Sequence, residues 1–180
     1  MDKKTLRQQQ IKKLNSNQSK TVSEGIELLH KLQETTEWKN AKTIATTVSG
    51  PFELPTTPII KAAQAGNKKI YLPKTMPHRQ MAFLPFTNSQ DLVRSDFGIL
   101  EPVYNEKLMN QTPDLVIVPG LAFAKDSNYR VGFGGGYYDR FLADFEGNTV
   151  ALVPSIMSFD SAIWDVQDHD IKIQRLICLD

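Results

Sequence analysis

Residues 112–120 read T-P-D-L-V-I-V-P-G and point to the fold class of this 180-residue chain. The apolar run from Leu115 to Val118 is bounded by prolines, which is typical of a strand buried on both faces. Such strands belong to parallel sheets that carry helices on both sides. We therefore expect a central strand here, which delivers the chain to the glycine-rich segment that follows.

Outward from this strand, strand-like and helix-like patterns alternate. Further strands are expected at 43–48, 68–73, 81–86, 149–154 and 171–178, and helices at 3–14, at 22–32, after residue 55 and from residue 137. The helix after residue 55 has Thr56 or Thr57 as its cap, Pro58 in its first turn and Gly66 at its end. The pattern predicts an α/β fold, a three-layer α/β/α arrangement with an open, mostly parallel sheet and N-terminal helices, in one domain spanning 1–180.

The composition gives no electrostatic case for a nucleic-acid or membrane partner. There are 21 basic and 20 acidic residues, and 41% of the chain is hydrophobic, as in an ordinary globular protein. The single cysteine, Cys178, excludes an internal disulfide and lies in an apolar run, where a buried, inert thiol is expected. We expect a cytoplasmic protein, without an apolar leader, that acts as a monomer on small molecules.

The segment at 130–140, R-V-G-F-G-G-G-Y-Y-D-R, carries the chemistry. Four glycines in five positions allow the backbone to approach a ligand closely, and the helix that follows presents free N–H groups to an anion. Arg130 supplies a forked positive charge, and Asp139 can hold a divalent cation. These features favour a nucleoside triphosphate with magnesium. A plain glycine turn is the alternative, because neither G-K-[ST] nor G-x-G-x-x-G is present.

Together with P-G-L-A-F at 119–123, this segment closely resembles the signature of the 5-formyltetrahydrofolate cyclo-ligases, also called 5,10-methenyltetrahydrofolate synthetases. The resemblance implies the same α/β fold and a reaction in which ATP and 5-formyltetrahydrofolate give 5,10-methenyltetrahydrofolate, ADP and phosphate. It implies Mg²⁺ as the cofactor and ATP as co-substrate. We interpret the reaction as phosphorylation of the formyl oxygen followed by attack of N10.

The resemblance also assigns site residues. The K-x-x-x-R of the family is matched by Lys3 and Arg7, which with Arg130 are the expected catalytic residues. Glu53, at the end of a strand, matches the folate-binding glutamate. The ATP-binding residues it implies are Lys3, Lys4, Thr5, Leu6, Arg7, Arg130, Val131, Gly132, Phe133, Gly134, Gly135, Gly136, Tyr137 and Tyr138. The substrate-binding residues are Val48, Glu53, Phe133, Gly134, Gly135, Gly136 and Tyr137.

For the metal, the resemblance implies Asp139 and Asp170. From the residues alone, Asp170 belongs to an acidic stretch that is usually solvated, as is the pair formed by Lys3 and Arg7. The family often has an aspartate where this chain has Gln174, which leaves open whether metal binding is weakened.

Several alternatives stay open from the sequence. Lys74, His78 and Arg79 either meet folate carboxylates or are simply solvated. One of Tyr137 and Tyr138 is expected to pack against the fold, and the other, Tyr137, to face the pterin, although the reverse is possible. The chain could instead be a non-catalytic folate or nucleotide-binding module of the same fold, or an α/β enzyme acting on a phosphorylated sugar or a coenzyme A ester.

Overall fold

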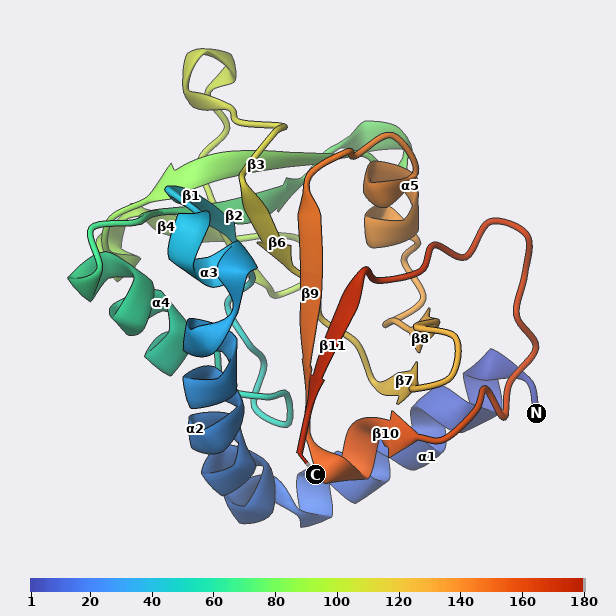
Figure 1. The fold of residues 1–180 in the computed structure, drawn as a ribbon. Coiled ribbons are helices and arrows are strands. Elements are labelled where there is room, and N and C mark those ends of the chain that lie inside the picture. The colour runs from blue at the N-terminus through green and yellow to red at the C-terminus, as the bar shows by residue number, and fades with distance from the viewer. Residues whose placement is uncertain (180) are drawn as a thin grey trace.

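A computed structural model, which describes residues 1–179, has a central six-stranded sheet with the order β11-β9-β6-β1-β2-β3 (Figure 1). All neighbouring strands are parallel except β2 and β3, which form an antiparallel hairpin at one edge. The strands are β1 Thr43–Ala45, β2 Lys69–Thr75, β3 Met81–Phe86, β6 Leu115–Ile117, β9 Asn148–Val153 and β11 Arg175–Cys178. The expected open, mostly parallel sheet is confirmed.

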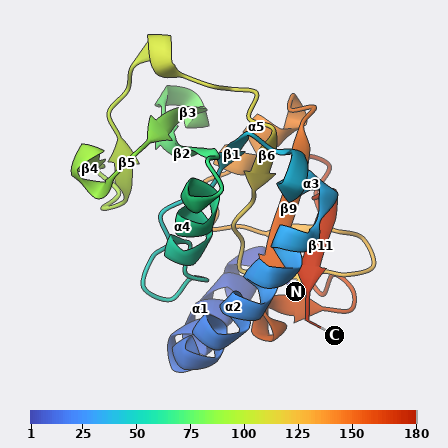
Figure 2. The same ribbon diagram turned by 60° about the vertical axis from the view of Figure 1, so that its left-hand side comes forward.

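Helices cover both faces of this sheet because alternate residues of its strands point to opposite sides. Ile44 packs in a core with α2 Gln18–Glu34, α3 Thr36–Asn40 and α4 Thr57–Ala65, and α2 and α4 lie side by side (Figure 2). The next residue, Ala45, packs in a second core with α1 Lys3–Ser16 and α5 Tyr137–Ala143. The result is the three-layer arrangement that the sequence predicts.

Two small sheets flank the central one. β7 Ala122–Ala124 pairs with β8 Arg130–Val131 and with β10 Ser158–Phe159, and β4 Leu92–Arg94 pairs with β5 Leu100–Pro102. Short 3₁₀ turns lie at Pro77–Arg79, Ser89–Asp91, Glu106–Leu108 and Ser155–Met157. The glycine segment follows the central strand β6, as expected, but it starts only after β8. The β7–β8 hairpin intervenes, and its strands are too short to recognise by pattern.

Several element ends differ from the predictions. The helix expected at 22–32 begins at Gln18, because only Asn17 interrupts the two N-terminal helices. The strand expected at 171–178 is paired only from Arg175, and the one expected at 43–48 ends at Ala45. Thr56 does precede α4, but its hydroxyl accepts from the Ser49 backbone N–H at 3.0 Å and does not cap the helix.

The connections place a topological switch point between β1 and β6. After β1 the chain crosses to β2 on one side, whereas after β6 it crosses to β9 on the other side. In open α/β sheets, ligands bind outside the carboxyl ends of the strands at such a point. The loops at 46–56 and 118–121 meet there. In the described part of the chain, no helix combines the length and apolar character needed to cross a membrane.

Candidate active site

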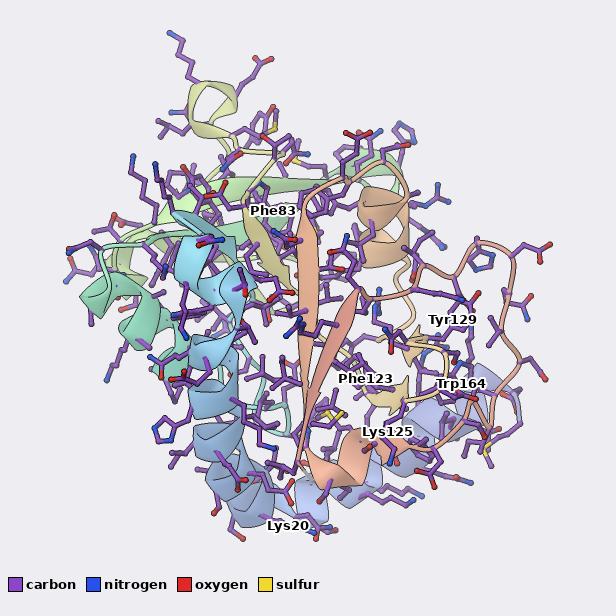
Figure 3. The ribbon with its side chains drawn as sticks, in the orientation of Figure 1. Lys20, Phe83, Phe123, Lys125, Tyr129 and Trp164 are labelled. Carbon is purple, nitrogen blue, oxygen red and sulfur yellow. The ribbon has the colours of Figure 1, made fainter. Side chains whose placement is uncertain are left out.

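Helix α1 lies across the small sheet at the carboxyl end of the central strands. Leu6 is buried in a cluster with Val131 and Trp164, which is labelled in Figure 3. Gln10 is fully buried, and its Nε2 donates to the carbonyl of Leu121 at 2.8 Å. A buried amide that binds a loop carbonyl fixes the position of the helix along that loop.

Of the two cations expected on α1, Lys3 contacts Asp170, one of the expected magnesium ligands, and Arg7 contacts the glycine segment. Lys3 Nζ lies 2.6 Å from Asp170 Oδ1 and also contacts the second carboxylate oxygen. Arg7 Nε donates to the carbonyl of Gly132 at 2.8 Å. A methyl group placed on Gly134 would lie 3.4 Å from Arg7 Cζ. The structure therefore brings Lys3 and Arg7 together with segments more than 120 residues away in the chain.

The glycine segment is an exposed turn between β8 and α5. Gly134 and Gly136 have φ of 102° and 72°, in the region that side chains rarely adopt. Gly132 has a different reason to be glycine, because a Cβ there would collide with the Arg130 guanidinium. Both Arg7 and Arg130 thus depend on Gly132, one through its carbonyl and the other through its missing side chain.

Arg130 is the most buried cation of the site. Its side chain is 4% exposed, its Nη2 lies 3.3 Å from Asp139 Oδ2, and its guanidinium stacks 5.7 Å from the centre of the Tyr138 ring. Burial lowers the pKa of Arg130, while the charges of Asp139, Tyr138 and Asp170 raise it. Its Nε and the Tyr138 hydroxyl are buried without a hydrogen-bond partner. Both atoms are therefore available to a hydrogen-bonding ligand.

The two aspartates expected to bind magnesium lie close together. Asp139 Oδ1 accepts from the backbone N–H of Ile171 at 3.2 Å, next to Asp170 in the chain, and Asp170 Oδ2 accepts from that of Gln167 at 2.8 Å. Among the described residues, no group of three or more His, Cys, Asp or Glu side chains could hold a metal ion. Magnesium bound with a nucleotide takes only one or two carboxylates, the rest being waters and phosphates, so this donor set fits it.

Glu53 lies in the loop after β1, as expected for the folate-binding residue. Its carboxylate accepts from the backbone N–H of Gly50, and burial raises its pKa although that bond lowers it. Neighbouring Phe52 packs against Phe133 of the glycine segment, with ring centroids 6.4 Å apart. The Glu53 loop and the glycine segment are thus joined by one aromatic contact.

A larger cavity than the one beside Glu53 lies at the opposite end of the sheet. A cleft of about 490 Å³ opens at the amino ends of β6 and β9 and is lined by four carboxylates, Glu37, Asp114, Asp144 and Glu146. These charges disfavour phosphates and folate carboxylates. The cavity beside Glu53 and Gly120 has a volume of about 40 Å³, which admits water but not a pterin ring.

The remaining predicted residues are placed as follows. The Thr5 hydroxyl donates to the helix-capping carboxylate of Asp2, and Lys4 is exposed. Val48 is partly buried against the first core. The Tyr137 ring packs against the second core and covers Gly135, where a Cβ would lie 2.8 Å from Tyr137 Cδ2. Which tyrosine faces the pterin stays a prediction.

The structure places two residues whose roles the sequence left open, and whether Gln174 weakens metal binding stays open. Gln174 binds the start of β9, because its Oε1 accepts from the Thr149 N–H at 3.1 Å and its Nε2 donates to the Gly147 carbonyl. Lys74 is not simply solvated, because its Nζ lies 3.0 Å from Glu101, which is 1% exposed. Sequence reasoning missed Glu101 and Gln10. The only signal for either was a polar residue at an apolar position of a strand or helix.

Comparison with known proteins relates the chain to one family. Residues 1–177 match the sequence model of the 5-formyltetrahydrofolate cyclo-ligase family. The chain belongs to this family. The cyclo-ligase of Haemophilus influenzae is 31% identical over 149 residues, covering 76% of this chain and 78% of the relative. The NMR structure of Aquifex aeolicus 5,10-methenyltetrahydrofolate synthetase covers 99% of this chain and 90% of its own, at 28% identity with a TM-score of 0.81.

A second solved structure supports the fold of the cyclo-ligase family. The 5,10-methenyltetrahydrofolate synthetase of Mycoplasma pneumoniae covers 98% of both chains with a TM-score of 0.72 at 22% sequence identity. The resemblance that the sequence carries at 119–123 and 130–140 is confirmed by these matches. Family membership also makes this a ligase-type reaction that uses ATP.

Proposed function

We propose that this protein converts 5-formyltetrahydrofolate and ATP into 5,10-methenyltetrahydrofolate, ADP and phosphate. The formyl oxygen attacks the γ-phosphorus and the bond to the β-phosphate oxygen breaks, which releases ADP. The folate N10 then attacks the activated carbon, the carbon–oxygen bond breaks, and phosphate leaves as N10 loses its proton. The substrate supplies its own nucleophile, which agrees with a site that is rich in cations and has no obvious nucleophilic side chain.

The protein's part in this reaction is to align the substrates and to place positive charge where negative charge develops. Lys3, Arg7 and Arg130 are proposed to bind the phosphates, together with the N–H groups of the glycine segment. Glu53 is proposed to hold the folate from the other side of the Phe52–Phe133 contact. An ionised Glu53 would accept hydrogen bonds from ring N–H groups of the pterin.

Magnesium would be held by Asp139 and Asp170, and when bound it would neutralise charge on the nucleotide phosphates. Arg130 and Lys3 form ion pairs with Asp139 and Asp170 respectively. On nucleotide binding, these two cations would turn toward the phosphates.

The observation that carries the proposal is the meeting of Arg7 and Arg130 at Gly132, with Glu53 linked to the same turn through Phe133. The test is to mix the protein with magnesium, ATP and 5-formyltetrahydrofolate and to follow the near-ultraviolet absorption of the methenyl product. We expect product to form and ATP to be consumed only when the folate is present. Folate-independent ATP consumption, or binding of both ligands without product, would contradict the proposal.

A further inference from the structure

The turn between β2 and β3, residues 76–80, plays no part in the mechanism above. It is tight, since the Met76 N–H donates to the Gln80 carbonyl at 2.9 Å. Within it His78 and Arg79 both have φ of 59°, which side chains rarely adopt. The Gln80 N–H also donates to the Pro77 carbonyl at 3.3 Å, so His78 and Arg79 are the central residues of a type I′ hairpin turn, which requires positive φ at both positions. The turn therefore fixes the backbone from which the Arg79 side chain extends.

This turn lies near α5, the helix that follows the glycine segment, and β3 contacts that helix (Figure 1). A methyl group placed on Gly136 would lie 3.9 Å from Arg79 Nη1. The corresponding distance from Gly134 to Arg7 Cζ is 3.4 Å. Two guanidinium groups, one from α1 and one from the β2–β3 turn, therefore lie near two glycines of the same turn, Gly134 and Gly136.

Charge at this end of the sheet is not balanced. The ion pairs of Lys3 and Arg130 neutralise the two aspartates of the site. Arg7 donates to a carbonyl, and Arg79 has no hydrogen bond or ion pair within the part of the chain that the structure describes. Two arginines without acidic partners, beside a glycine-rich turn, form a site for an anion with several oxygens.

We propose that Arg79 binds anionic oxygens of a substrate at the glycine segment, opposite Arg7, and so sets the affinity for that substrate. The inference rests on the proposed function and adds a specificity-determining residue to it. Nucleotide phosphates and the glutamate carboxylates of the folate offer a guanidinium the same chemistry. The nearness of Gly136 favours the phosphates.

The test compares Arg79→Ala with Arg79→Gly. Both remove the guanidinium, but glycine tolerates the left-handed backbone, so any effect common to both comes from the side chain and not from strain. Arg94→Ala is the matched control, because Arg94 is an exposed arginine that donates only to Gly98 within the β4–β5 hairpin. For each protein we would measure the Kd of ATP by calorimetry and the KM of ATP and of folates with one or several glutamates.

For phosphate binding we expect both Arg79 variants to raise the KM and Kd of ATP about tenfold, as for one charge-assisted hydrogen bond, with kcat nearly unchanged. A rise confined to the KM of the folates would assign Arg79 to the carboxylates instead. Unchanged values for all ligands, or equal effects of Arg94→Ala, would overturn the inference. Calorimetry keeps this test separate from the proposed function, because ATP binding is measured even if no product forms.

Discussion

The two ends of the central sheet differ in both volume and charge. The amino end has a cleft of about 490 Å³ lined by four carboxylates, whereas the carboxyl end has a cavity of about 40 Å³. The small cavity is lined in part by Glu53, whose loop contacts the glycine segment through Phe52 and Phe133. Volume alone would place a ligand at the amino end, whereas the proposed function places it at the carboxyl end.

The topology of the sheet explains the difference. Loops that follow parallel strands gather at their carboxyl ends, so segments distant in sequence bring cations and a side-chain-free turn together there. At the amino end, carboxylates serve other purposes, as when Asp114 accepts from the backbone N–H groups of Lys42 and Thr43 at 2.8 and 2.9 Å. The proposed ligand site at the carboxyl end therefore rests on charge and backbone conformation and not on cavity volume, and the following predictions test it.

The largest effect is expected from Arg130→Ala. It removes the buried charge at the glycine segment, and kcat should fall by about 10³-fold or more. It should also cost about 3 kcal/mol of stability, because Asp139 loses its partner in a largely buried ion pair. The matched control is Arg175→Ala, which breaks an ion pair with Glu37 at the amino end. Steady-state kinetics and thermal unfolding of both variants check this; equal losses of kcat would contradict it.

The next effect is expected from Gly132→Ala, because the added methyl group would displace the Arg130 guanidinium. A displacement of about 1 Å can lower kcat about 100-fold. Gly147→Ala is the matched control, since its methyl group would press on the Phe145 ring at the amino-end cleft. We expect Gly147→Ala to lower the unfolding temperature but not kcat. Loss of kcat in that variant alone would place the chemistry at the amino end.

A smaller effect is expected from Glu53→Gln, which should weaken folate binding but stabilise the fold at pH 7. The KM of the folate should rise about tenfold, because a charged acceptor is lost. Burial raises the pKa of Glu53 above its ordinary value of 4.5, so the folded state favours the protonated carboxyl. Its stabilising contribution is present below that ordinary value and is lost as the pH rises through the raised pKa.

Glu53→Gln should therefore unfold at a higher temperature than the wild type at pH 7, with the difference shrinking toward pH 4. Thermal unfolding across this range checks the sign. A variant that is less stable than the wild type at pH 7 would show that the charged carboxylate is favoured in the folded state.

The smallest effect is expected from the double substitution Asp144→Asn with Glu146→Gln. Both side chains are exposed at the amino-end cleft, where salt screens their influence on distant ligands. The KM of ATP and of the folate should change less than about twofold. A tenfold change in either KM would show that the larger cleft binds substrate.

Most of the fold could be predicted from short stretches of sequence, because buried strands and glycine turns have recognisable local patterns. Met81–Phe86 is a strand with the expected bounds, and α4 starts and ends where Thr57, Pro58 and Gly66 indicate. The two-residue strand β8 could not be predicted, because its partner lies across a turn and no periodicity develops. Its position nevertheless determines where the glycine segment starts.

The site was harder to derive because its contacts join distant segments. Nothing local links Lys3 to Asp170, which are 167 residues apart, or Arg79 to Gly136. The family resemblance assigned Lys3 and Asp170 to one site but did not predict their ion pair, and the nearness of Arg79 to Gly136 followed from neither residues nor resemblance. Tyr138 was seen in the sequence, but its contact with Arg130 depends on how α5 turns after Gly136.

The most direct measurement is to follow the backbone amide resonances of isotope-labelled protein while ADP and magnesium are added. If the nucleotide phosphates bind at the carboxyl end, the amides of Gly132, Gly134, Gly135 and Gly136 shift strongly and that of Gly147 stays in place. Shifts confined to Gly147 and its neighbours in the acidic cleft would contradict the account.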